Sequence, residues 1–312
     1  MKFPVFDLHC DTSNPIVGQG GIPCCELREN NAHVDLMRAK TLDGYAQCFA
    51  CFCWQGMFKN DENPFEKKLA AMKIQFEKNK DIIRQAFSSE DIENNYKNGL
   101  MSAILTIEGP AGFNFDPDKL ENLYKKEGFR ISTLGWNEIN PLAGHHASNV
   151  GLTDLGKKYV KEAQRLGMLI DVSHLSDEGF WDIMKITKKP IIASHSSSRK
   201  VYNTSRNISD KMFLAIKETG GVCGINLYDG CLGESPTIDT FCDHILHFVE
   251  LDPEAKHISL GGDLDGIDSL PENFNGVEDY PKISKRLLER GLSDENVLDI
   301  FWNNALRALK NA

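Results

Sequence analysis

The stretch Val5-Phe6-Asp7-Leu8-His9-Cys10-Asp11-Thr12 lies within the first dozen residues, and the rest of the chain is best interpreted from it. An apolar run leads directly into a His-x-Asp pair, which is typical of a buried strand that ends in polar residues. Alternate side chains of a regular strand share a face, which predicts two sets: Phe6, Leu8 and Cys10 on one face, and Asp7, His9 and Asp11 on the other. We therefore expect His9 and Asp11 to project side by side, where two ligands can bind one cation.

Seven further apolar segments follow the first one, and several of them also end in a polar residue. They span residues 45–54, 102–109, 129–136, 168–174, 190–195, 221–228 and 257–262. Helical patterns over 63–87, 153–165, 209–219, 237–251 and 293–309, with a further helix capped by Ser176, alternate with these segments. Eight strands that alternate with helices predict a (β/α)8 barrel, whose chemistry lies at the carboxyl ends of the strands. We find no linker and no internal repeat, so we expect one domain over residues 1–312.

Composition excludes several classes of protein. Hydrophobic residues make up 41% of the 312, which suffices for a large core, and the net charge is −10 without a basic stripe, which disfavours nucleic acid and anionic membranes. The chain has no apolar run of about 18 residues and no secretory signal at its first residues. Nine cysteines are an odd number, which favours reduced thiols. We expect a cytoplasmic protein without a nucleic-acid or membrane partner.

Four of the strand ends carry the residue types that bind metal ions: His9 with Asp11, Glu108, His174 and His195. Five ligands exceed the need of one catalytic zinc, which keeps three protein ligands and an open position. Two cations that share Glu108 fit better, with His9 and Asp11 on one ion and with His174 and His195 on the other. Such a pair, about 3.5–4 Å apart, can hold a bridging water and lower its pKa, which generates hydroxide at neutral pH.

Two further residues are placed to assist this chemistry. Asp263 ends the last strand, across the barrel mouth from His9, and a carboxylate there can carry a proton from the attacking water to a leaving nitrogen. Arg206 lies in the loop after His195, where a guanidinium suits a substrate carboxylate. Tyr228, at the end of the seventh strand, is a further candidate for substrate contact.

Five motifs in this order resemble the renal (membrane) dipeptidase family of the amidohydrolase superfamily: Asp7-Leu8-His9-Cys10-Asp11, Thr106-Ile107-Glu108-Gly109, Asp171-Val172-Ser173-His174, Ala193-Ser194-His195-Ser196-Ser197 and Gly261-Gly262-Asp263-Leu264-Asp265-Gly266. The resemblance covers residues 7 to about 307. It implies a binuclear zinc site bridged by Glu108, with Asp263 as proton carrier and Arg206 on the free carboxylate of a dipeptide. It also implies hydrolysis of dipeptides, often with a D- or dehydro-residue on the C-terminal side, and a homodimer. Manganese, cobalt or iron are alternatives to zinc.

The sequence departs from the family pattern at two positions. The well-studied branch has a histidine at the end of the fourth strand, where it helps to bind the substrate, and this chain has Trp136. An indole donates one hydrogen bond but does not titrate, so the substrate range is expected to differ, and His145 and His146 are candidates to substitute. Trp302 stands in the closing helix where the family usually has glycine.

Simpler interpretations apply to other residues. His33, His244, His247 and His257 are expected to be structural, and Asp171 and Asp265 to be supporting or capping groups. Cys48 and Cys51 form a lone C-x-x-C whose thiols would point to opposite faces of a strand, so we expect buried packing residues.

Three functions remain open from the sequence. The first is a zinc-dependent dipeptidase. The second is a binuclear hydrolase of another amide, such as an N-acyl amino acid or a lactam, and Trp136 motivates it. The third is a metal-binding protein without turnover, which is disfavoured because every expected catalytic group is present.

Overall fold

The computed structural model describes residues 2–18, 25–58 and 62–312, in which all strand pairings within the sheet are parallel. The eight strands of the closed ring are β1 (Val5–Cys10), β2 (Tyr45–Phe52), β4 (Met101–Glu108), β5 (Phe129–Thr133), β6 (Leu169–Asp171), β7 (Ile191–Ala193), β8 (Val222–Ile225) and β9 (Ile258–Leu260). The ring runs β2-β1-β9-β8-β7-β6-β5-β4 and closes where β2 pairs with β4. A ninth strand, β3 (Ile83–Gln85), adds to the start of β4. The prediction of a (β/α)8 barrel is therefore confirmed.

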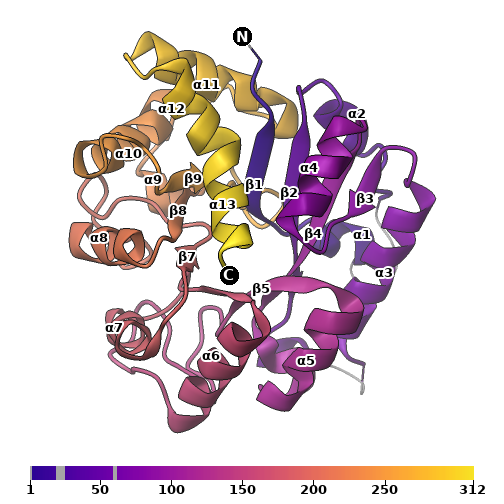
Figure 1. The fold of residues 1–312 in the computed structure, drawn as a ribbon, viewed down its shortest axis with the longest axis vertical. Helices are drawn as coiled ribbons and strands as arrows, with labels where there is room; N and C mark the ends of the chain where they lie inside the picture. The colour runs from indigo at the N-terminus through magenta and orange to yellow at the C-terminus, as the bar shows by residue number, and fades with distance from the viewer. Residues whose placement is uncertain (1, 19–24, 59–61) are drawn as a thin grey trace.

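Helices surround this ring of strands (Figure 1). The longer ones are α3 (Pro64–Lys78), α4 (Ser89–Lys97), α6 (Asp154–Leu166), α7 (Asp177–Ile186), α8 (Asp210–Glu218), α10 (Ile238–Leu251), α11 (Tyr280–Glu289) and α13 (Asn304–Lys310). The short ones are α1 (Ser13–Val17), α2 (Leu36–Ala39), α5 (Leu120–Asn122), α9 (Asp229–Leu232) and α12 (Asp294–Leu298). Helices α6, α7 and α8 begin where predicted. Their cap residues are Thr153, Ser176 and Ser209, and each side chain accepts a backbone N–H of the first turn.

The barrel interior is filled by apolar side chains from its strands, and the closing helix covers one end. The interior cluster includes Phe6, Leu8, Ala46, Cys48, Ile104, Ile131, Leu169, Ile192 and Val222, together with Trp302, Ala305, Ala308 and Leu309. Figure 1 views this end, where α13 lies across the centre of the ring. Trp302 is 6% exposed, and its ring lies 5.9 Å from that of Phe6 and 5.3 Å from that of Tyr96. Trp302, one of the two tryptophans that depart from the family pattern, thus fills the end of the barrel that α13 covers.

A second, larger cluster lies between the strands and the helices, and Cys51 belongs to it whereas Cys48 points into the barrel. Their opposite directions confirm that this C-x-x-C is a pair of packing residues. Seven of the cysteines that the structure describes are free thiols: Cys10, Cys48, Cys51, Cys53, Cys223, Cys231 and Cys242. The ninth, Cys24, lies outside the described residues.

The predicted helix over 63–87 is too long. Helix α3 ends at Lys78, because Asn79 caps it and donates its backbone N–H to the carbonyls of Gln75 and Phe76. The apolar residue Ile83, which the helical pattern had included, instead pairs with Met101 in β3. Helices α4 and α11 were not predicted at all, because both carry mostly polar residues and present a narrow buried stripe.

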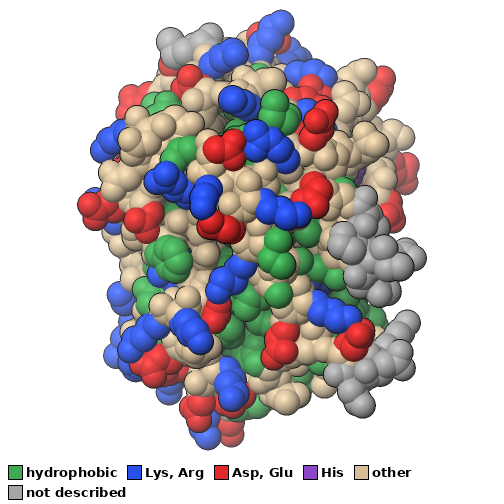
Figure 2. Space-filling view, turned by 90° about the vertical axis from the view of Figure 1, so that its right-hand side faces the viewer, with side chains coloured by type: hydrophobic (Ala, Val, Ile, Leu, Met, Phe, Trp, Pro, Cys, Tyr) green, Lys and Arg blue, Asp and Glu red, His purple; other side chains and the backbone are tan. Residues whose placement is uncertain are grey.

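Charged side chains of both signs are interspersed on the face that carries α3 and α4 (Figure 2), and this face has no extended basic patch among the described residues. Ion pairs such as Lys73–Glu127, at 2.6 Å, join the two signs there. The helices that the structure describes are all too short or too polar to cross a membrane.

Candidate metal centre at the carboxyl ends of the strands

The first strand carries a bulge that changes which of its side chains face the barrel interior. Phe6 and Leu8 belong to the interior cluster, whereas Cys10 packs in the outer one. The pairing register with β2 shifts between Asp7 and Cys10, so Leu8 and its neighbour His9 both turn inward. The prediction of strict alternation is therefore wrong. Asp7 does not share a face with His9, and Cys10 does not share one with Phe6 and Leu8. A bulge re-aims one side chain, and here it directs His9 toward the mouth of the barrel.

Asp7 stabilises this bulge from the outer side of the strand. Its Oδ1 atom accepts the backbone N–H groups of His9, at 3.1 Å, and of Gly262, at 2.9 Å. Its Oδ2 atom accepts the hydroxyl of Tyr280. Burial raises the pKa of Asp7, and these hydrogen bonds act against that rise. The carboxylate thus ties β1 to β9 at the level of the site.

Metal-ligand side chains from four strand ends meet in two overlapping groups. His9, Asp11 and Glu108 form the first trio, and Glu108, His174 and His195 form the second; within each trio the candidate ligand atoms lie within 4.8 Å of one another. Glu108 Oε2 lies 3.5 Å from His9 Nε2, and Glu108 Oε1 lies 3.1 Å from His174 Nε2. Each carboxylate oxygen of Glu108 therefore faces one trio, as the sequence-based hypothesis of a shared ligand requires.

Three atoms of the first trio are buried without a hydrogen-bond partner. They are His9 Nε2, Asp11 Oδ1 and Glu108 Oε2. A buried polar atom without a partner costs roughly 1–3 kcal/mol, so three in one place indicate a site that binds a ligand. Imidazole nitrogens and carboxylate oxygens together suit a divalent cation such as zinc. The residues present thus fit a pair of metal ions.

Supporting side chains hold the two imidazoles of the second trio. His174 Nδ1 lies 2.8 Å from Asn137 Oδ1, and His195 Nδ1 lies 2.7 Å from Ser194 Oγ. Asp171 accepts the backbone N–H of Ser194 at 2.9 Å. Bonding at Nδ1 turns Nε2 of each imidazole toward the site, where the two Nε2 atoms lie 2.8 Å apart and can both bind metal. Asp171 thus has the supporting role predicted for it, whereas Asn137 was not predicted, because a single amide after a strand gives no recognisable pattern.

The electrostatics of the cluster reflect carboxylates crowded into a buried site. Burial, followed by the charge of Asp11, raises the pKa of Glu108 to about 7. Burial lowers the pKa of His9, but the carboxylates of Glu108 and Asp11 outweigh it and raise this pKa well above its usual value. Burial and neighbouring positive groups lower the pKa of both second-trio imidazoles well below the usual value. The neutral imidazoles of His174 and His195, together with the neighbouring carboxylates of Glu108 and Asp11, form a site that favours cations.

Asp263 lies at the edge of both trios. Its Oδ1 atom is 3.8 Å from His9 Nε2, and with His9 and His195 it forms a third possible ligand group. Asn226, at the end of β8, donates a hydrogen bond from Nδ2 to Asp263 Oδ2 at 3.1 Å. Burial raises the pKa of Asp263 to about 6. Asn226 is a second supporting amide that sequence reasoning missed.

Arg206 points its guanidinium at the second trio, with Nη2 3.2 Å from His174 Nε2. Among the residues described, no carboxylate lies within ion-pair distance of Arg206. Arg199, by contrast, forms a two-point ion pair with Asp177 at 2.7 and 2.8 Å. Of these two, Arg206 is therefore the arginine that is available to a substrate anion, whereas the charge of Arg199 is paired within its loop.

Half-buried aromatic rings line the mouth beside His174. The ring of Trp136 lies 5.1 Å from Phe52, 5.8 Å from Trp54 and 6.4 Å from His174. We call Phe52, Trp54 and Trp136 the aromatic wall. Lys68, a buried lysine that the sequence did not single out, supports it by donating from Nζ to the carbonyl of Phe52 at 2.6 Å.

The other mouth residues take less central places. Tyr228 is 38% exposed, and its backbone N–H donates to Asn226 Oδ1 at 2.7 Å. His146 lies next to the site through its backbone N–H, which donates to the carbonyl of His174 at 2.7 Å. Its imidazole contacts Ser205, and burial lowers its pKa to about 4. Neither His145 nor His146 belongs to a candidate ligand group among the described residues.

A closed parallel barrel whose strand ends gather imidazoles and a shared carboxylate is an architecture on which metal-dependent hydrolases are built. The sequence gives the family: all residues from 1 to 312 match the model of the membrane dipeptidase family, peptidase family M19, and the chain belongs to that family.

Individual relatives agree with this assignment. The chain is 36% identical over 217 residues to an uncharacterized dipeptidase of Schizosaccharomyces pombe, a match that covers 67% of this chain and 53% of that protein. The chain thus spans about half the length of that curated relative. The fold is similar to that of a family M19 dipeptidase, with a TM-score of 0.89, 20% identity and coverage of 100% of this chain and 99% of the other. A metallopeptidase from Rhodobacter sphaeroides, bound to a phosphinate mimic of the dipeptide L-Ala-D-Ala, gives a TM-score of 0.88 at 20% identity, with coverage of 100% and 99%.

Proposed function

We propose that this protein hydrolyses the peptide bond of dipeptides with a pair of zinc ions held by His9, Asp11, Glu108, His174 and His195. The observation that carries the proposal is the pair of trios that share Glu108, with unpartnered buried ligand atoms in the first. When bound, two such cations lower the pKa of a water molecule between them and polarise the scissile carbonyl. Membership of the membrane dipeptidase family and the dipeptide mimic bound by the Rhodobacter metallopeptidase support this substrate class.

Asp263 is the proton carrier in this proposal. Its carboxylate accepts the proton of the attacking water and delivers it to the nitrogen of the leaving amino acid. A pKa raised to about 6 leaves most of the group ionised at neutral pH, while keeping the protonated form accessible. The hydrogen bond from Asn226 keeps one oxygen fixed, so that the other faces His9 and the reaction centre.

Arg206 and the aromatic wall position the substrate. Arg206 binds the free carboxylate of the dipeptide, because its guanidinium reaches the site and lacks a carboxylate partner among the described residues. Tyr228 contributes an exposed ring on the β8 side of the mouth. Trp136 replaces a polar contact of the family with a ring surface, so apolar and aromatic side chains of the substrate gain contact there.

Three finer expectations accompany this function as proposals. Zinc is favoured over manganese, cobalt or iron because the site is rich in imidazole. Seven reduced cysteines among the described residues favour a cytoplasmic location. A homodimer follows from family resemblance alone.

A panel of L,L-, L,D- and D,D-dipeptides, assayed after metal quantification, tests the proposal. We expect about two metal ions per chain, cleavage that a chelator abolishes and zinc restores, and a loss of at least about 100-fold in kcat for Asp263→Asn with its metal content unchanged. An N-acyl amino acid and a lactam serve as matched amide controls, and we expect slower turnover of both. Metal-loaded protein that cleaves these controls but no dipeptide refutes the substrate class. Full activity of Asp263→Asn refutes the role of Asp263.

A further inference from the structure

The loop that follows β9 holds two non-glycine residues in the left-handed region. Asp263 has a φ of 56° and Asp265 a φ of 66°. Residues other than glycine adopt this conformation at a cost, and it persists only where surrounding contacts enforce it. One of these two residues is the proposed proton carrier. The contacts that enforce the loop therefore also set the position of a reacting group.

The contacts of Asp265 come from two distant segments. Its Oδ2 atom accepts the hydroxyl of Thr12 at 2.6 Å, and its Oδ1 atom accepts the backbone N–H of His33 at 2.6 Å. In return, the backbone N–H of Asp265 donates to His33 Nδ1 at 3.0 Å. We call this reciprocal pair of hydrogen bonds the His33–Asp265 clasp. The imidazole acts as an acceptor for a backbone group inside the left-handed turn itself.

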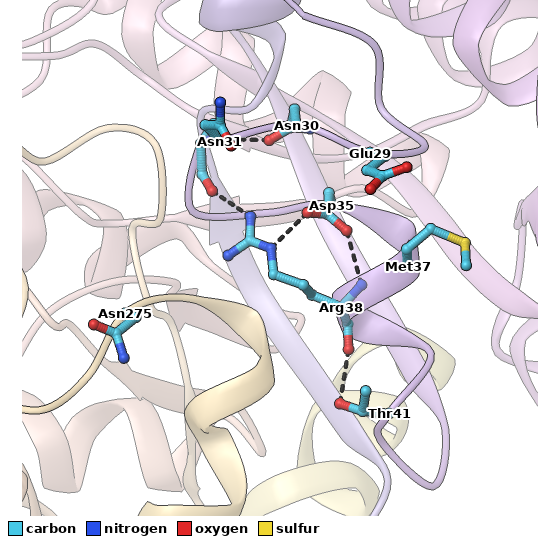
Figure 3. Close-up of a pocket in the computed structure, with 9 residues that line it drawn as sticks. Glu29, Asn30, Asn31, Asp35, Met37, Arg38, Thr41 and Asn275 are labelled. Carbon is cyan, nitrogen blue, oxygen red and sulfur yellow. Dashed lines mark hydrogen bonds and ion pairs between the residues drawn. The ribbon is translucent and has the colours of Figure 1, made fainter.

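The segment that carries His33 is itself firmly held. The carbonyl of His33 accepts the N–H of Val277 at 3.0 Å. Arg38 braces the segment: it binds Asp35 (Figure 3) and donates to the carbonyl of Ala32. Its Nη1 atom also lies 3.1 Å from Glu278 Oε2. These partners satisfy Arg38, so its guanidinium is not available to a ligand in the hollow that Figure 3 shows beside it.

We propose that His33 is a positioning residue for the reaction: through the clasp it holds the loop of Asp263 and Asp265 in its left-handed conformation and so aims the carboxylate of Asp263 at the metal centre. This inference rests on the proposed function for the role of Asp263. His33 lies outside both trios and does not reach the reacting atoms. Its contribution is to keep Asp263 between Asn226 and His9.

Two substitutions of His33 separate the acceptor from the bulk of the ring. His33→Ala removes Nδ1, whereas His33→Asn places an amide oxygen at the same distance along the side chain, where it can accept the N–H of Asp265. For His33→Ala we expect kcat to fall about tenfold, with KM and bound metal within about twofold, because a small displacement of a reacting group acts on the chemical step. For His33→Asn we expect kcat to recover to within about threefold of the unaltered protein.

Hydrogen exchange of residues 263–267 gives a readout that is independent of activity. The amide of Asp265 loses its acceptor in His33→Ala, so its exchange should accelerate about tenfold, and His33→Asn should restore the slow rate. Thr12→Val, which removes the donor to the other carboxylate oxygen, should repeat the loss of kcat at unchanged KM. Asn31 is an exposed neighbour in the same segment, so Asn31→Ala is the matched control. It should change neither kcat nor the exchange rate of the Asp265 amide.

Several outcomes overturn the inference: a kcat of His33→Ala within twofold of the unaltered protein, equal damage in His33→Asn and His33→Ala, or a parallel loss of metal and kcat. If the unaltered metal-loaded protein cleaves no dipeptide, the proposed function fails, whereas the exchange experiment still decides whether His33 holds the loop. If His33→Ala does not fold, the kcat and hydrogen exchange of His33→Asn and Thr12→Val still decide whether the clasp positions the loop of Asp263.

Discussion

Replacing Glu108 by glutamine should stabilise the metal-free protein, although it removes the shared ligand. The pKa of Glu108 is raised from 4.5 to about 7, chiefly by burial and then by Asp11. Since one pKa unit corresponds to about 1.4 kcal/mol, the buried carboxylate costs the metal-free protein roughly 3 kcal/mol above about pH 7. Glutamine has the shape of the protonated acid without this cost.

The sign of the pH dependence follows from the same pKa values. A carboxyl group whose pKa is raised by folding binds its proton more tightly in the folded state. Between pH 4.5 and about 7, the folded protein therefore loses stability as pH rises, relative to Glu108→Gln. Below about pH 4.5 the acid is protonated in both states, and the difference between the two proteins should vanish.

Urea unfolding of chelator-treated protein at about pH 8 and about pH 5 measures this difference. We expect Glu108→Gln to be more stable by about 3 kcal/mol at the higher pH, and to be the less stable protein once metal is added, because an amide bridges two cations poorly. Glu218→Gln, at an exposed position, is the control and should match the unaltered protein at both pH values. Equal stability of the unaltered protein and Glu108→Gln at pH 8 without metal would refute the reasoning.

Three further predictions concern substrate contacts and the bulge. Arg206→Met should raise KM for dipeptides about 100-fold, because a charge-assisted contact to the carboxylate is lost. KM for C-terminally amidated dipeptides should not change. An equal rise in KM for both substrates contradicts the assigned role. Trp136→Ala should lower kcat/KM about tenfold for dipeptides with an aromatic side chain and leave glycylglycine unaffected, which a steady-state comparison of the two substrates checks. Tyr280→Phe should destabilise the protein by about 1–3 kcal/mol in urea unfolding, since Asp7 loses a buried donor, whereas Tyr96→Phe at the surface should cost much less.

The sequence predicted the barrel and the members of both trios for one physical reason. Carboxyl ends of parallel strands meet at one face of a barrel, so polar residues at those ends converge whatever their separation along the chain. Glu108 directly follows an apolar run, and His174 and His195 lie within a few residues of one, which made all three recognisable. The structure brings all three within ligand distance of one another.

Two kinds of feature were not predicted from the sequence: irregularities of the backbone, and uncharged side chains that support the site. The bulge in β1 leaves no trace in a run that already alternates, yet it reverses the direction of Asp7 relative to His9. Asn137 and Asn226 are single amides in loops, so neither periodicity nor charge marks them. His33 looked structural because its partner, Asp265, lies far along the chain.

The seam at which β1 meets β9 has a consequence for biosynthesis. Asp7 of the first strand pairs with Leu260, so the ring stays open while most of the chain is still being translated. His9 and Asp11 leave the ribosome early and wait for the segment that carries Asp263. A pocket that needs the closed ring therefore forms late in synthesis, and an interrupted translation product exposes His9 and Asp11 without the wall that β9 contributes.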